Sequence, residues 1–266
     1  MSEAARRPLR SLPAAAPGAR PSARHVRSLR LRLADGAWTT VHVATYDPTR
    51  TALTVVRLPA PTPLATWCAA NDATDAIVGG FFVRATGVPL GEVRTRGIVR
   101  ETVPFAMPWG ETRACVHAEN ERVTIARRPE LPAEPRGDLL QAGPLLVSGG
   151  APCVDGDPEG FSQASEQFDS DITVGRYPRA ALGIGRRGRL LAVAADGRAP
   201  GDAGLTLAEL AEAMIALGAT RAINLDGGGS TSLVCGGELR NVPREGDGAP
   251  IPGGRPVTTA LVFTAR

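Results

Sequence analysis

Residues 190–226 limit the possible fold of this chain more strongly than any other stretch of its sequence. A continuous apolar run over 190–195 predicts a strand that is buried on both faces. Thr206 and Glu209 have the spacing of a helix capping box, and an apolar stripe of helical period follows them. A second apolar run over 222–225 predicts another strand. We therefore predict a strand–helix–strand unit whose two strands run parallel.

Two carboxylates follow the strands of this predicted unit. Asp196 comes directly after the first strand, and Asp226 directly after the second. The carboxyl ends of parallel strands lie at one edge of a sheet, about 4.8 Å apart for neighbours and about twice that for next-but-one strands. Ligands of open α/β sheets bind in the crevice at such an edge. We expect Asp196 and Asp226 to face one crevice.

Short strands separated by turns are expected along most of the remaining chain, which contains 31 glycines and 23 prolines. Alternating apolar residues predict a hairpin over 29–46 and another strand over 52–58. Thr62 and Pro63 have the sequence signature of the cap and the first residue of a helix that ends near residue 70. Residues 148–171 are long for a loop without secondary structure and form a candidate lid or binding loop.

These elements predict a fold of the α/β (mixed α+β) class, with a central mixed sheet and flanking helices. We assign residues 25–266 to a single domain. Residues 1–24 are rich in Arg, Ala and Pro and are predicted to be a disordered tail.

Composition argues against several classes of function. The net charge is +3, but residues 1–30 contain seven arginines and a single acid, so the rest of the chain is mildly acidic, and we expect no nucleic-acid partner. There is no apolar run long enough to span a bilayer and no apolar core of a secretory signal, so we expect no membrane partner and a cytoplasmic location. The four cysteines are scattered and lack a histidine cluster, so we expect neither a metal nor another cofactor.

Two glycine-rich turns are the strongest local signals. Asp226 is followed by Gly227, Gly228, Gly229 and Ser230, which indicates a backbone that closely approaches another group or adopts positive φ angles. A tight turn between two strands explains the same pattern. The segment is neither a P-loop, which needs Gly-Lys-Ser/Thr, nor a nucleophile elbow, which needs Gly-x-Ser-x-Gly. A second glycine pair, Gly79 and Gly80, also follows a short apolar strand.

Five segments, in this order, resemble those of the phosphodiester glycosidase family. The chain is similar to the family over roughly residues 40–266, and the run 196–231 is the most specific part. The five segments are Ala76–Phe82, Arg179–Gly185, Asp196–Arg198 with Gly204–Ala211, Asn224–Thr231, and Arg255–Val257.

This resemblance implies a hydrolase that cleaves the glycosidic bond of a sugar-1-phosphodiester and releases free sugar and a phosphomonoester. The family includes the enzyme that removes N-acetylglucosamine from a phosphodiester to uncover mannose 6-phosphate. At two positions this chain departs from the family pattern. Val78 stands where the family usually has Asn, and Val242 where it usually has Arg, and we expect both positions to lie near the ligand.

Hydrolysis at an anomeric carbon generally uses two carboxylates. Our hypothesis assigns this role to Asp226 and Asp196, with Asp226 as base or nucleophile. Arginines bind phosphate through charge-assisted hydrogen bonds. The residues expected to bind the phosphate are Arg179, Arg198 and Arg255. We further expect the amides of Gly79, Gly80 and Gly227–Gly229 to form anion-binding nests, and Ser230 and Asn224 to orient the substrate.

Two alternatives remain open from the sequence. One is a phosphodiesterase, which would attack phosphorus. The other is a non-catalytic module that binds a sugar phosphate without turnover, and Val78 favours this second hypothesis. The sequence leaves open the sugar, its aglycone, the stereochemistry and whether the chain forms a homo-oligomer. Its composition and the expected location suggest a phosphorylated metabolite of bacterial secondary metabolism as the substrate.

Overall fold

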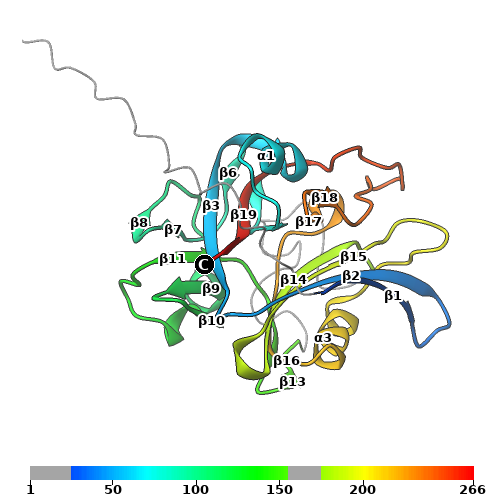
Figure 1. Cartoon of the computed structure of the whole chain (residues 1–266), viewed down its shortest axis with the longest axis horizontal. Coiled ribbons are helices and arrows are strands. Elements are labelled where there is room, and N and C mark those ends of the chain that lie inside the picture. Colours follow the sequence, from blue (N-terminus) through cyan, green and yellow to red (C-terminus); the bar gives the residue numbers. More distant parts are fainter. Residues whose placement is uncertain (1–24, 155–174) are drawn as a thin grey trace, which may run out of the picture.

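Antiparallel β-sheets dominate the computed structural model, which describes residues 25–154 and 175–266 (Figure 1). The largest sheet has seven strands, in the order β1 (His25–Arg32), β2 (Trp38–Tyr46), β15 (Leu190–Ala195), β14 (Arg179–Gly185), β16 (Ala219–Asn224), β12 (Leu145–Ser148) and β13 (Ala151–Pro152). A second sheet has the order β10 (Arg122–Arg127), β9 (Ala114–Glu119), β11 (Asp138–Gln141), β7 (Val93–Thr95) and β8 (Ile98–Val99).

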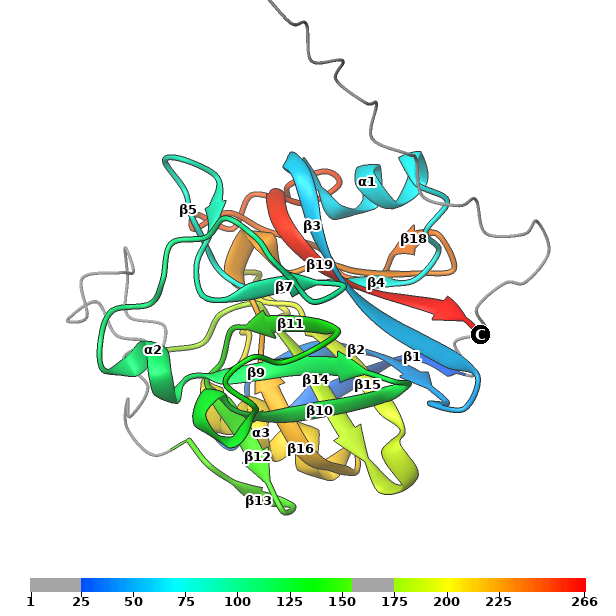
Figure 2. The same cartoon turned by 90° about the vertical axis from the view of Figure 1, so that its left-hand side faces the viewer.

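A third sheet has the order β18 (Glu238–Leu239), β17 (Leu233–Cys235), β4 (Ala76–Val78), β19 (Pro256–Ala265) and β3 (Thr51–Pro63). A small pair, β5 (Phe82–Val83) and β6 (Val88–Pro89), completes the sheet structure of the described residues. Figure 2 shows the second sheet between β3 and β19 on one side and β14 and β16 on the other.

Helices are few and short in the described residues. The α-helices are α1 (Leu64–Ala70), α2 (Trp109–Thr112) and α3 (Leu207–Ala216), and the 3-10 turns are η1 (Arg128–Glu130), η3 (Arg186–Gly188) and η4 (Gly228–Ser230). No helix in this part of the chain is long and apolar enough to cross a membrane.

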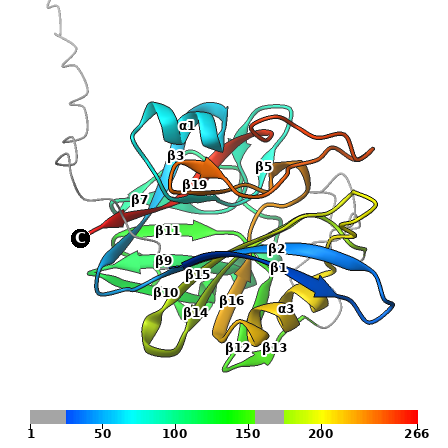
Figure 3. The ribbon, with the colours of Figure 1, turned by 45° about the vertical axis from the view of Figure 1, so that its right-hand side comes forward.

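The predicted fold class is therefore only partly right. Every strand pairing in the described sheets is antiparallel, so the central sheet is not mixed. Helix α3 packs on β12, β13 and β16 of the largest sheet, as Figure 3 shows. The other faces are covered mainly by neighbouring sheets, which the local sequence patterns do not reveal.

The continuous apolar run in β15 has a clear structural reason. Its residues alternate between two cores. Leu190, Ala192 and Ala194 pack into a cluster shared with the other sheets, whereas Leu191, Val193 and Ala195 pack into a second cluster that includes α3. Because both faces are covered, the strand tolerates no polar residue on either side.

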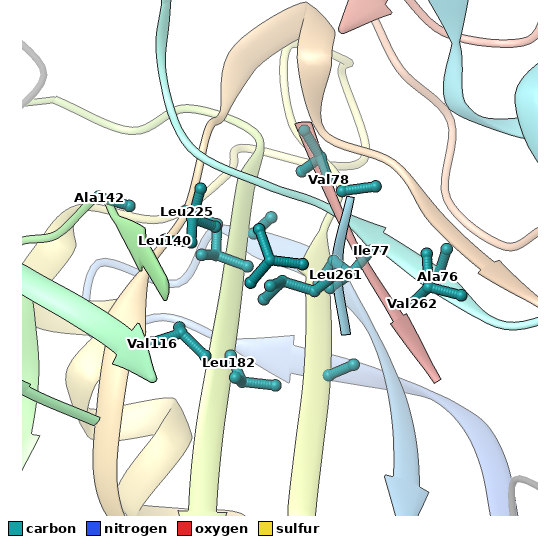
Figure 4. Close-up of a cluster of buried hydrophobic side chains, with 14 of the residues drawn as sticks. Ala76, Ile77, Val78, Val116, Leu140, Ala142, Leu182, Leu225, Leu261 and Val262 are labelled. Atoms are coloured by element: carbon teal, nitrogen blue, oxygen red, sulfur yellow. The ribbon is translucent and has the colours of Figure 1, made fainter. Parts of the chain in front are cut away.

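Figure 4 shows how side chains from different sheets meet in the first of these cores. Leu182 of β14 and Val116 of β9 lie in the same cluster as Ile77 and Val78 of β4. Val78 is fully buried, and its amide donates to the carbonyl of Ser232. The Val78 side chain therefore belongs to the hydrophobic core, although the next residue, Gly79, accepts from the Asp226 amide through its carbonyl, so that position 78 neighbours the predicted site.

The strand–helix–strand prediction is confirmed in its direction. Strands β15 and β16 both run antiparallel to β14, which lies between them, so they run parallel to each other as next-but-one neighbours. The capping box is present: Thr206 Oγ1 accepts from the Glu209 amide at 3.1 Å, and Glu209 Oε2 accepts from the Thr206 amide at 2.9 Å.

The hairpin and the first helix were predicted with unequal success. Strands β1 and β2 pair in register from His25–Thr45 to Arg32–Trp38, as expected. Helix α1 begins at Leu64, with Pro63 as its N-cap and no side-chain cap. Thr62 instead donates its hydroxyl to the carbonyl of Ala60, so the predicted capping role is wrong.

Two predictions concern segments outside the described residues. They are the disordered tail over 1–24 and most of the candidate lid, since residues 155–174 are not described.

Candidate active site

One edge of the seven-stranded sheet brings the predicted site residues together. Arg179 begins β14 and pairs with Ala195 at the end of β15, directly before Asp196. Ala181, two residues into β14, pairs with Asn224 at the end of β16. Asp196 and Asp226 therefore leave the same edge of the sheet, with the start of β14 between them.

Asp226 lies at the base of the glycine-rich turn. Its amide donates to the carbonyl of Gly79 at 3.0 Å, which joins the two glycine turns that the sequence singled out. Its Oδ1 accepts from the Gly227 amide at 2.9 Å, and the Ser230 hydroxyl also bonds the carboxylate. The carboxylate is thus held in place by the residues that follow it.

Burial raises the pKa of Asp226 to about 6, even though hydrogen bonds from Ser230 and Gly227 and the charges of Arg255 and Arg84 act in the opposite direction. Desolvation disfavours the ionised form of a carboxylate, and here it outweighs two nearby arginines. A carboxyl with a pKa near neutrality is suited to exchange protons during a reaction.

Asp196 differs from Asp226 in its hydrogen-bond partners. It is 6% exposed, and both carboxylate oxygens are bonded inside the protein. Oδ1 accepts from the Val242 amide at 2.7 Å, and Oδ2 lies 2.8 Å from Nε2 of His42. These bonds leave Asp196 less available than Asp226 to a substrate. They also place Val242, the second departure from the family pattern, next to the predicted site.

Two arginines line the glycine-rich turn. A Cβ atom on Gly229 would lie 2.8 Å from Nη2 of Arg255, and one on Gly228 would lie 3.3 Å from Nη2 of Arg198. A side chain at residue 229 would therefore displace the guanidinium group of Arg255. Burial and the nearby Arg255 charge lower the pKa of Arg198, as expected for crowded cations.

Arg198 and Arg255 form the arginine cluster of the site, and Arg179 lies behind it. It is 2% exposed; its Nε donates to the carbonyl of Leu205 at 3.0 Å, and its guanidinium group lies 5.2 Å from the ring centre of Tyr177. Burial lowers the pKa of Arg179 to about 10, and the charge of Arg198 acts in the same direction. This environment suits a residue that supports the site from inside better than one that contacts a substrate.

Four of the five amides that were predicted to form anion nests already donate within the protein. The Gly79 amide donates to the Thr259 carbonyl and the Gly80 amide to Thr259 Oγ1. The Gly227 amide donates to Asp226 and the Gly228 amide to the carbonyl of Pro178. Because these four donors are already used, the arginine side chains are the better-placed anion ligands, and the role of the Gly229 amide stays a prediction.

The remaining predicted residues are buried beneath the turn. Asn224 is 1% exposed, and its Nδ2 donates to the carbonyls of Gly143 and Leu225. Ser230 is 2% exposed and bonds Asp226. Both residues hold the turn, and the Ser230 hydroxyl bonds the Asp226 carboxylate; their role in orienting a substrate stays a prediction.

Sequence reasoning missed three residues of the site: Arg84, Tyr177 and Glu245. Arg84 follows β5 and its charge acts on both Asp226 and Arg198. The ring of Tyr177 lies 5.7 Å from the Arg198 guanidinium group, and Glu245 forms an ion pair with Arg255. A search for arginine near the glycine turns would have found Arg84, whereas Glu245 lies in a turn without a local signal.

No group of three or more His, Cys, Asp and Glu side chains within residues 25–154 and 175–266 is arranged to hold a metal ion. The described site is thus a partly buried carboxylate beside a cluster of arginines, at the edge of a largely antiparallel β fold. Such a site fits a protein that binds an anionic ligand next to an acid–base group.

The sequence model of the phosphodiester glycosidase family matches residues 71–264, and the chain belongs to this family. It is 30% identical over 185 residues to the N-acetylglucosamine-1-phosphodiester alpha-N-acetylglucosaminidase of Bos taurus, covering 66% of this chain and 33% of that protein. The corresponding protein of Mus musculus is 29% identical over 179 residues, covering 63% of this chain and 32% of the relative. The chain spans about a third of the length of these curated relatives.

Solved structures show the same fold. The catalytic domain of the zebrafish N-acetylglucosamine-1-phosphodiester alpha-N-acetylglucosaminidase matches with a TM-score of 0.71 at 20% identity, over 91% of this chain and 83% of that domain. A hypothetical protein from Synechocystis matches with a TM-score of 0.63 at 20% identity, over 91% of this chain and 62% of the other.

Proposed function

We propose that this protein hydrolyses the glycosidic bond of a sugar-1-phosphodiester, releasing free sugar and a phosphomonoester. The observation that carries the proposal is the position of Asp226, whose carboxylate has a pKa near 6 and lies among the charges of Arg255 and Arg84. The family supports a glycosidase that acts on sugar phosphodiesters. The site supplies an acid–base carboxylate and a cationic anchor for phosphate side by side.

The chemistry follows from the leaving group. When the bond between the anomeric carbon and the phosphate oxygen breaks, the electron pair stays with the phosphate, which leaves as a phosphomonoester. This charge requires neutralisation, which Arg198 and Arg255 are placed to provide through charge-assisted hydrogen bonds. Ionised Asp226 either takes the proton of the attacking water, or attacks the anomeric carbon itself to form a glycosyl ester that water then hydrolyses to free sugar.

Asp196 has a supporting role in this proposal. Both of its oxygens hold other parts of the protein, namely His42 and the Val242 amide. It therefore fixes the segment around Val242 against the sheet edge, and the chemistry at the anomeric carbon rests mainly on Asp226.

The decisive experiment is hydrolysis of a panel of sugar-1-phosphodiesters, including nucleotide sugars, with free sugar detected by mass spectrometry. We expect free sugar from the wild type and at least a 1000-fold lower rate from Asp226→Asn, on the order of the loss of an essential catalytic group. Glu238→Gln is a matched control, since Glu238 pairs with Arg240 at the surface, outside the arginine cluster.

Water labelled with oxygen-18 separates the proposal from attack at phosphorus. In the glycosidase reaction the label enters the sugar, whereas in a phosphodiesterase reaction it enters the phosphate. Binding of the diesters without release of either product would instead identify a sugar-phosphate binding protein.

A further inference from the structure

An acidic side chain lies within the arginine cluster of the site. Glu245 Oε2 forms a short ion pair with Nη2 of Arg255, the same guanidinium group that lies against Gly229. The charge of Glu245 also acts on Arg198. It raises the pKa of Arg198, although burial lowers that pKa by more. One carboxylate thus reaches two of the arginines proposed to bind phosphate.

The backbone around Glu245 is fixed, which gives its side chain a defined direction. Its amide donates to the carbonyl of Ala249 at 2.9 Å, and its carbonyl accepts from the Gly248 amide at 3.0 Å. The preceding carbonyl, of Arg244, accepts from Nη1 of Arg198 at 3.0 Å. The turn that carries Glu245 is therefore bonded directly to the arginine cluster, while the Glu245 side chain is 46% exposed and accessible to solvent.

A carboxylate in this position opposes the binding of any anion, and it opposes a dianion more than a monoanion. A phosphodiester carries one negative charge at neutral pH, whereas a phosphomonoester carries close to two, because its second pKa is about 6. Since the interaction energy scales with the product of the charges, the penalty in binding free energy is about twice as large for the monoester.

We propose that Glu245 is the charge-selecting residue of this site, which favours phosphodiesters over phosphomonoesters at the arginine cluster. The inference rests on the proposed function, since it requires a phosphate site at Arg198 and Arg255. Glu245 thereby disfavours sugar 1-phosphates as ligands. It also promotes release of the phosphomonoester product, whose second charge appears only after the glycosidic bond is broken.

The test compares Glu245→Gln with wild type in the binding of two small probes, phenyl phosphate and its diester methyl phenyl phosphate, followed by NMR titration. Removal of one charge strengthens monoanion binding by about threefold and dianion binding by about the square of that factor, roughly tenfold, at pH 7.5. At pH 5 phenyl phosphate is a monoanion, so the two gains become equal. Glu238→Gln, which removes a carboxylate paired with Arg240 elsewhere, should change neither affinity.

Equal gains for the two probes at pH 7.5, or no gain for either, would refute the charge-selecting role while leaving the phosphate site intact. Failure of both probes to bind wild type and variant would refute the phosphate site itself, and with it the proposed function. Thermal unfolding of Glu245→Gln serves as the folding control, and we expect a midpoint close to that of the wild type because the side chain is half exposed.

Discussion

Nε2 of His42 lies 2.8 Å from Oδ2 of Asp196, although 154 residues separate them in the chain. The other ring nitrogen, Nδ1, lies 2.9 Å from the hydroxyl oxygen of Ser28. With Asp196 Oδ1 accepting from the Val242 amide, this contact links strand β2, the end of β15 and the segment after β18. The pair therefore fixes the position of one wall of the site.

Replacing His42 by Ala should lower the free energy of unfolding by about 2 kcal/mol, because it leaves a buried carboxylate oxygen without its partner. Urea unfolding at pH 7 measures this change. Arg27→Ala is the control: Arg27 is the exposed neighbour on the same strand, and we expect a change below about 0.5 kcal/mol. A His42→Ala variant as stable as wild type would show that the contact does not hold the sheet edge.

Asp226 should make the protein less stable as the pH rises through its own titration range. Its pKa is about 6 in the folded protein, whereas an aspartate freely exposed to water has a pKa of 3.8, so between these values the unfolded chain ionises while the folded protein stays protonated. Stability therefore falls from about pH 4 to about pH 6 and the loss remains above that range.

The Asp226→Asn variant cannot ionise at this position, so it should not lose stability as the pH rises from about 4 to about 6. The variant should be more stable than wild type by about 3 kcal/mol at pH 7.5 and equal to it below about pH 4, as measured by urea unfolding at both pH values. A loss of stability of this kind is expected for a carboxylate with the role that we propose for Asp226. A variant that is less stable than wild type at pH 7.5 would mean that the hydrogen bonds from Ser230 and Gly227 outweigh burial.

Parts of this fold could be predicted because their causes are local. The capping box at Thr206 lies within four residues, and Gly218 ends α3 with a φ of +94°. The direction of β15 and β16 also follows from the intervening helix. In contrast, the insertion of antiparallel β14 between them depends on a pairing that no local pattern encodes.

The same distinction applies to the site. Asp226 and its glycines could be recognised, since a buried strand leads directly into the turn. The surroundings of the two aspartates could not be predicted from the sequence. Asp196 contacts His42, whereas Asp226 lies among the charges of Arg84 and Arg255. These contacts join residues far apart in the sequence, and burial, which decides the pKa of Asp226, is a property of the folded protein.

Arg198→Ala should weaken phosphodiester binding by about 10- to 100-fold, with a smaller effect on stability, because it removes a charge-assisted contact to phosphate. Isothermal titration calorimetry against the substrate found in the panel measures the affinity. Arg27→Ala, an exposed arginine on β1, should leave the affinity unchanged. Equal affinity in Arg198→Ala and wild type would exclude Arg198 from the phosphate site.

Gly79 should be the glycine whose substitution damages both fold and site. A Cβ atom there would lie 2.4 Å from Oγ1 of Thr259 and 2.8 Å from its backbone carbonyl carbon, so the strand itself would have to move. Thr259 Oγ1 accepts from the Gly80 amide, and the Gly79 carbonyl accepts from the Asp226 amide. Displacement at residue 79 is therefore transmitted to Asp226.

We expect Gly79→Ala to lower the free energy of unfolding by about 1–3 kcal/mol, the usual cost of overpacking a core. Its kcat should fall as well, measured under conditions where the variant is fully folded. Gly201→Ala is the matched control, because nothing lies within 4 Å of a Cβ atom at that exposed position. A stable Gly79→Ala variant with wild-type kcat would mean that Thr259 and the strand adjust without moving Asp226, and that the link between the two glycine turns has no role in catalysis.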